Sequence, residues 1–145
     1  MNKFFVAMIS LIFAGSVYAY DFGVSATWTP ESQLSTASAE VSVGNLLAGV
    51  DVDLQPIAVA VTAGFFQEVW DPEGSTIYAV ARAGLPVYED SAFVVGQAYM
   101  TAGLMLIPDT DSAGAVSFEA GFTSTLADFS LTQIPGMYAR VGVVF

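Results

Sequence analysis

The feature that most constrains this chain is a period-two alternation of apolar residues with polar or small ones, which begins at Tyr20. In 20–28, for example, the even positions read YFVAW and the odd positions read DGST. A period of two is that of a β-strand, whose successive side chains point to opposite faces. The pattern predicts eight strands, at 20–28, 38–43, 48–53, 57–66, 77–85, 92–106, 116–123 and 137–145.

The segments between these strands carry turn residues. Gly44-Asn45 separates two alternating runs and is typical of a two-residue β-hairpin. Asp71–Gly74 and Pro135-Gly136 are further turn sequences. Because the chain has neither an internal repeat nor a linker, we expect residues 20–145 to form a single antiparallel, all-β domain.

The first nineteen residues have a different character. A short basic start with Lys3 precedes an apolar run from Phe4 to Ala14, and Val17 and Ala19 place small residues before a cleavage point. This layout predicts a cleaved secretory signal peptide at 1–19. The alternative is an uncleaved membrane anchor, for which the apolar run is short.

Composition excludes several classes of function. The chain has no cysteine and no histidine, which removes disulfides, thiolate or imidazole zinc sites and histidine bases. Three Lys and Arg residues against fourteen Asp and Glu residues cannot form a basic patch, so we expect no nucleic-acid partner. We also expect no cofactor. Since 54% of the residues are hydrophobic, this acidic chain must bury apolar surface in a core, a partner or a lipid.

The faces opposite the apolar ones are rich in small and ionic residues. Six glycines fall there, which indicates a steric need, because glycine weakens a strand. The only basic residues after the signal also fall there, among acids. Buried charges persist only when paired. We therefore predict a barrel whose polar faces line a narrow interior, with a lumen charge cluster of Arg82, Arg140, Glu40, Asp51, Asp53 and Glu119; the alternative is ordinary surface charge.

The apolar faces, in contrast, carry no charge. A transmembrane barrel turns such faces towards lipid, where a cation at the midplane costs about 2–4 kcal/mol. Aromatic residues near strand ends predict a girdle at headgroup level, formed by Tyr20, Phe22, Trp28 and Phe65. Packing of these rings in a core is the alternative. Eight strands of about ten residues fit residues 20–145, so we expect an eight-stranded up-and-down transmembrane β-barrel.

The last nine residues, MYARVGVVF, resemble the terminal strand of bacterial outer-membrane β-barrels, closest to the small OmpA/OmpX-type barrels. Phe145 matches the usual final aromatic residue, and Val143 and Val141 match the alternating apolar positions. Val143 and Met137 stand where aromatic residues are usual. The resemblance implies a bacterial outer-membrane location, insertion by the outer-membrane assembly machinery, lipid as the surrounding partner, and both termini in the periplasm.

We expect a non-catalytic structural or surface role, with a polar interior filled by side chains. We expect no enzyme activity, since the enzymes among the outer-membrane barrels that the chain resembles use a histidine. Two alternatives remain. The barrel would bind or pass small apolar molecules, in a membrane or as a soluble secreted protein whose pocket is lined by aromatic residues such as Phe118 and Phe122. Less favoured is a helical inner-membrane protein, with Ser91–Pro108 as its charge-free span.

Overall fold

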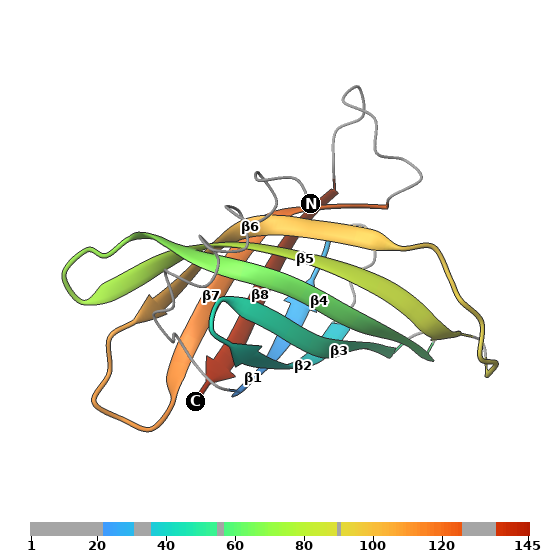
Figure 1. Cartoon of the computed structure of the whole chain (residues 1–145), viewed down its shortest axis with the longest axis horizontal. Helices are drawn as coiled ribbons and strands as arrows, with labels where there is room; N and C mark the ends of the chain where they lie inside the picture. The colour runs from blue at the N-terminus through green and yellow to red at the C-terminus, as the bar shows by residue number, and fades with distance from the viewer. Residues whose placement is uncertain (1–21, 31–35, 55–56, 90, 126–135) are drawn as a thin grey trace, which may run out of the picture.

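The computed structural model describes residues 22–30, 36–54, 57–89, 91–125 and 136–145. The predicted signal peptide and Tyr20 lie outside the described residues. Eight antiparallel strands close into a barrel, each pairing with its neighbours in sequence and β1 pairing with β8 (Figure 1). The strands are β1 (Phe22–Trp28), β2 (Thr36–Val43), β3 (Leu46–Leu54), β4 (Ile57–Trp70), β5 (Ser75–Glu89), β6 (Tyr99–Pro108), β7 (Ala115–Thr125) and β8 (Gly136–Val144).

This architecture confirms the predicted all-β, eight-stranded antiparallel barrel. The helical alternative is wrong, because residues 99–108 of its proposed span form β6. No helix among the described residues is long and apolar enough to cross a membrane.

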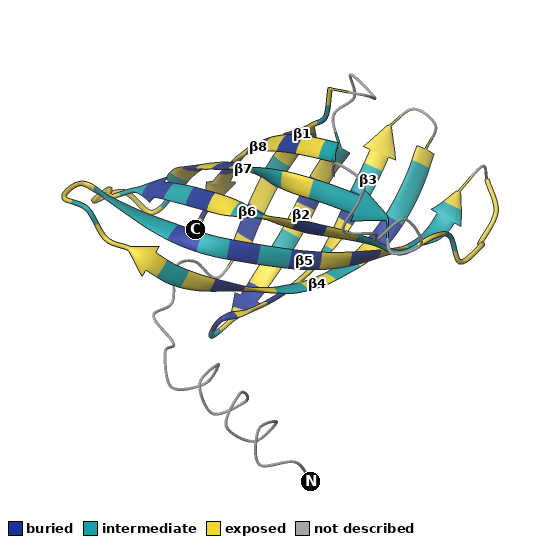
Figure 2. Ribbon diagram, turned by 90° about the horizontal axis from the view of Figure 1, so that it is seen from above, coloured by how far each residue is buried: buried dark blue, intermediate teal, exposed yellow. Residues whose placement is uncertain are grey.

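The alternation of the sequence becomes an alternation of burial along every strand. Figure 2 shows that buried and more exposed residues alternate along the strands of the barrel. The apolar positions face outwards, as Val41 (47% exposed), Phe118 (49%) and Val141 (53%) illustrate, whereas Arg82 (4%) and Arg140 (6%) face inwards. The aromatic lining predicted for a soluble barrel is not found. The residues that would form it are 42–53% exposed on the outer face: Phe22, Trp28, Phe118 and Phe122.

The strands differ from their predicted bounds, and β4, β5 and β6 differ most: β5 runs to Glu89 instead of residue 85. β4 continues beyond Phe66 to Trp70. Its last residues pair with β5 alone, because the pairing of β4 with β3 stops at Phe65. The β4–β5 hairpin consequently projects past the shorter strands β1–β3 (Figure 1). β6 starts at Tyr99 instead of residue 92, because its regular pairing with β5 and β7 begins there. Before it, the backbone N–H groups of Val94 and Gly96 donate to the carbonyls of Val87 and Pro86 outside this pairing.

The two ends of the barrel are distinct. We call the end that carries residues 44–45, 71–74, 109–114 and Phe145 the turn end, and the opposite end, which carries Trp28 and Gly136, the loop end. The predicted two-residue hairpin is confirmed at Gly44-Asn45, where Gly44 has a φ of 60°, a value that glycine adopts without steric cost.

The interior is polar over only part of its length, which corrects the predicted polar interior. An apolar cluster fills the turn end, and its largest members, Phe66 (1% exposed) and Met105 (2%), leave almost no accessible surface. These side chains come from inward positions of five strands and pack as a small hydrophobic core would. The cluster comprises Leu47, Phe66, Tyr78, Val80, Met105, Ile107 and Val144.

Candidate functional site in the barrel interior

The ionic centre of the barrel is Arg82, which joins two carboxylates from other strands. Its Nε and Nη2 each donate to Glu40 at 2.9 Å, and its Nη1 donates to Glu119 Oε1 at 2.6 Å. All three side chains are at least nine-tenths buried. A planar guanidinium suits this task, because it binds one carboxylate with two parallel bonds and still reaches a second.

A second layer of polar side chains extends this centre towards β8 and β1. The hydroxyl of Tyr138 donates to Glu119 Oε1 at 2.5 Å, so this oxygen accepts from both Tyr138 and Arg82. Arg140 donates through Nε to Thr27 Oγ1 at 2.9 Å, and its Nη1 lies 4.0 Å from Glu40 Oε2. Four of the six predicted cluster residues thus form one connected network.

The other two predicted cluster residues belong to a separate group nearer the loop end. Asp51 accepts a hydrogen bond from the Tyr99 hydroxyl at 2.6 Å, and Asp53 accepts one from the Thr36 hydroxyl. Within the described part of the chain, ion pairs link the arginines to Glu40 and Glu119 and not to these aspartates. Asp51 is buried, whereas Asp53 is exposed at the rim.

Glycines make room for the large interior side chains. Arg82 stands directly across from Gly64 on the neighbouring strand, and Tyr99 stands across from Gly84. A Cβ atom at residue 64 would lie 2.9 Å from Arg82 Cγ, and one at residue 84 would lie 2.6 Å from Tyr99 Cε1. The glycines that the sequence places on the polar faces therefore meet a steric demand of the narrow interior. The same pairing recurs at Glu40–Gly49 and Tyr138–Gly121.

This pairing predicts the effect of a side chain at residue 64. We expect Gly64→Val to lower the free energy of unfolding by about 1–3 kcal/mol, because the new side chain displaces Arg82 and meets the carbonyl oxygen of Ala81. Urea titration of the folded barrel measures the loss. Ala63→Val, on the adjacent outward position, is the matched control and should leave stability nearly unchanged. Equal losses in both variants would contradict the steric role of Gly64.

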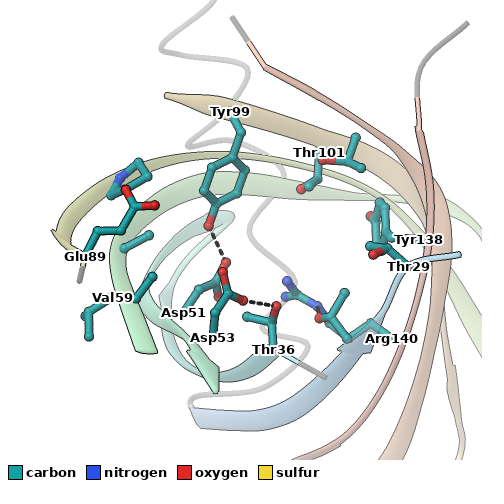
Figure 3. Close-up of a pocket in the computed structure, with 15 residues that line it drawn as sticks. Thr29, Thr36, Asp51, Asp53, Val59, Glu89, Tyr99, Thr101, Tyr138 and Arg140 are labelled. Atoms are coloured by element: carbon teal, nitrogen blue, oxygen red, sulfur yellow. Dashed lines mark hydrogen bonds between the residues drawn. The ribbon is translucent and has the colours of Figure 1, made fainter. Parts of the chain in front are cut away.

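Beyond the ionic network, a cavity of about 420 Å³ occupies the loop end of the barrel. Figure 3 shows Arg140 on one side, Glu89 on the other, and Asp51 and Asp53 between them, with Tyr99 above. Because Asp53 and Glu89 are exposed, the cavity meets solvent at this end. The cavity lies on the opposite side of the Arg82 network from the apolar cluster.

The remaining predicted site residues lie on the outer surface. Phe22, Trp28 and Phe65 are all more than 40% exposed, with Trp28 at the loop end and Phe22 at the turn end. Phe145 stacks on Phe22 with ring centroids 6.3 Å apart, and the backbones of these two residues exchange hydrogen bonds where the barrel closes. The other residues of the predicted assembly signal, Val141 and Val143, face outwards from β8.

Sequence reasoning missed the tyrosines of the interior. Tyr99 and Tyr138 lie on the polar faces of their strands. This position could have predicted their role, because a tyrosine that faces the lumen needs a hydrogen-bond partner for its hydroxyl. Among the described residues, no group of three or more acidic side chains is placed to hold a metal ion.

We compared the chain with models of known protein families, with curated proteins and with solved structures, and none of them matches it. The structure itself defines a class: a small, closed, eight-stranded antiparallel β-barrel with an ionic network at its centre.

Proposed function

We propose that this chain is an integral β-barrel of a bacterial outer membrane, with a non-catalytic structural or surface role. The observation that carries the proposal is the outer face of the barrel. Among the exposed residues of the described strands, only Asp53 and Glu89 are charged, and both lie at the loop end. Large apolar side chains are exposed on every strand. A soluble monomer rarely exposes so continuous an apolar surface, whereas lipid requires one.

The ends of the barrel support an orientation. The connections at the turn end are short, with two residues at 44–45, four at 71–74 and six at 109–114. Outer-membrane barrels place their short turns in the periplasm. We therefore place the turn end, with Phe145, in the periplasm. A signal peptide at 1–19 would deliver the chain there, and the outer-membrane assembly machinery would recognise the strand that ends in Phe145.

Fractionation and refolding test this proposal. The chain expressed from Met1 should fractionate with outer membranes, and the purified chain should fold into phospholipid vesicles. The folded form should migrate differently from the boiled form in SDS gels, because a closed barrel resists the detergent. A chain that remains a folded monomer in aqueous buffer without lipid or detergent would refute the proposal.

A barrel filled in this way should not conduct ions. Phe66 and Met105 close the turn end, and Arg82 with its two carboxylates crosses the centre. We expect planar lipid bilayers that contain the folded chain to show no steady conductance above that of lipid alone. A stable, reproducible channel current would show that the interior is an open path, and it would contradict the role proposed for these side chains.

A further inference from the structure

The most exposed large apolar side chain among the described residues is Phe93, at 88%. It belongs to the segment 92–96, which follows β5 at the loop end and is exposed over residues 92–95, where Figure 2 draws it in yellow. This segment runs back along β5. Ala92 exchanges two backbone hydrogen bonds with Glu89, and the N–H of Val94 donates to the carbonyl of Val87. The segment therefore extends the barrel wall by hydrogen bonds and displays apolar side chains on it.

The segment has two faces, and one of them belongs to the outer face of the barrel. A Cβ atom at Gly96 would lie 2.9 Å from Pro86 Cβ, and Pro86 lines the loop-end cavity. Residue 96 thus faces inwards, and Val94, two positions earlier in an extended backbone, shares that face. Phe93 and Val95 (71% exposed) consequently point outwards.

Phe93 is placed on the outer face by a second observation, its contact with Tyr88. The two rings pack edge to face with centroids 5.3 Å apart. Tyr88 faces outwards, because its neighbour Glu89 lines the cavity and successive residues of a strand face opposite sides. The outward residues at this end contain no charge. We call them the loop-end apolar patch, and they are Leu85, Tyr88, Phe93 and Val95.

The height of this patch corresponds to the edge of a bilayer. At the turn end, Ile77 of β5 pairs with the exposed Trp70 of β4. Tyr88 follows Ile77 by eleven positions on β5, which is a rise of about 28 Å for a strand tilted by about 40°. The apolar band of an outer-membrane barrel is about 25 Å tall. When Ile77 lies at one edge of the bilayer, Tyr88 and Phe93 therefore reach the headgroups at the other edge, where aromatic rings are favoured.

From this arrangement we propose that the loop-end apolar patch is a membrane anchor, which inserts Phe93 and Val95 between lipids at the boundary of acyl chains and headgroups. The proposal rests on the membrane location proposed above. Lipid is the occupant that the structure favours, because the patch continues the apolar outer face of β5 without a charged side chain. Glu89 and Val94, on the other face of this extension, remain in water.

The test follows one tryptophan in the full chain folded in phosphatidylcholine vesicles. Trp28→Phe and Trp70→Phe remove the two native tryptophans. In this background, we expect Phe93→Trp fluorescence to be quenched more by lipids brominated near the headgroups than by lipids brominated at the chain ends, and little by acrylamide in water. Val94→Trp, on the inward face, is the matched control and should be quenched mainly by acrylamide.

Phe118→Trp in the same background separates this inference from the proposed function, because Phe118 faces outwards from β7. If brominated lipids quench Phe118→Trp while Phe93→Trp responds only to acrylamide, the anchor is wrong and the patch is left to water or to a protein partner. If both variants respond only to acrylamide, the membrane location itself is wrong. Equal quenching of Phe93→Trp and Val94→Trp by lipid would overturn the assignment of the two faces.

Stability provides a second readout that needs no tryptophan. Val95→Ser should lower the urea midpoint of the chain folded in vesicles, because it removes an apolar side chain from the lipid. Val94→Ser is the same change on the inward face and should leave the midpoint unchanged. Equal midpoints for Val95→Ser and the wild type would also overturn the anchor.

Discussion

Replacing Arg82 with leucine is expected to lower the free energy of unfolding by about 3–5 kcal/mol, the largest loss we expect from a single change in this chain. The substitution removes three hydrogen bonds, leaves Glu119 buried without a cation, and leaves Glu40 with only Arg140, 4.0 Å away. A buried carboxylate that loses its partner retains its desolvation penalty and loses the attraction that offset it. Urea titration of the barrel folded in lipid vesicles measures the loss.

Two controls separate the stability lost to an unpaired buried charge from the stability lost to poorer packing. Arg82→Leu combined with Glu119→Gln should recover most of the stability, because residue 119 is then neutral and Glu40 keeps its ion pair with Arg140. Asp109→Asn, on an exposed turn, should change stability by no more than about 0.5 kcal/mol. If Arg82→Leu were as mild as Asp109→Asn, the ionic network would contribute little to the fold.

The second large effect is expected on the outer face. Ala120 points outwards from the middle of β7, next to the inward-facing Glu119. We expect Ala120→Arg to cost about 2–4 kcal/mol in vesicles, because it places a cation near the bilayer midplane. Ser124→Arg is the matched control, since Ser124 follows on the same face at the loop end of the same strand, where the cost falls to about 0–1 kcal/mol.

This pair of variants reports on lipid and not on barrel packing. Both side chains leave the interior untouched, so a difference between them reflects depth in the bilayer. The measurement is again a urea titration in vesicles. Equal and small costs at residues 120 and 124 would mean that the outer face of β7 is surrounded by water.

The strands were predictable because their two faces differ in chemistry. In residues 116–123 of β7 and 137–143 of β8, apolar residues alternate with polar residues or glycine, and the faces follow directly from the sequence. The pattern fails where both faces carry apolar residues. At the turn ends of β5 and β6 the sequence reads IYAVA and LMLI, so alternation cannot separate the outward side chains from the apolar cluster inside. That cluster was therefore not predicted.

The ionic site was predictable only in part. A shortage of cations among many acids, on faces with glycine, indicates that Arg82 and Arg140 are paired inside. Which acid pairs with which arginine depends on contacts across the lumen between strands that are not neighbours. Those contacts follow from the closure of the barrel, which no local pattern encodes. Hence Glu40 and Glu119 join Arg82, whereas Asp51 bonds Tyr99.

The most direct test of the central claim is a nitroxide scan along β7 in lipid vesicles. The chain has no cysteine, so single substitutions from Phe118→Cys to Phe122→Cys provide unique labelling sites. If the outer face lies in the bilayer, labels at 118, 120 and 122 will collide readily with oxygen and rarely with a water-soluble nickel chelate, and labels at 119 and 121 will collide little with either. Ready collision of the outward labels with the nickel chelate along this whole stretch would contradict the account.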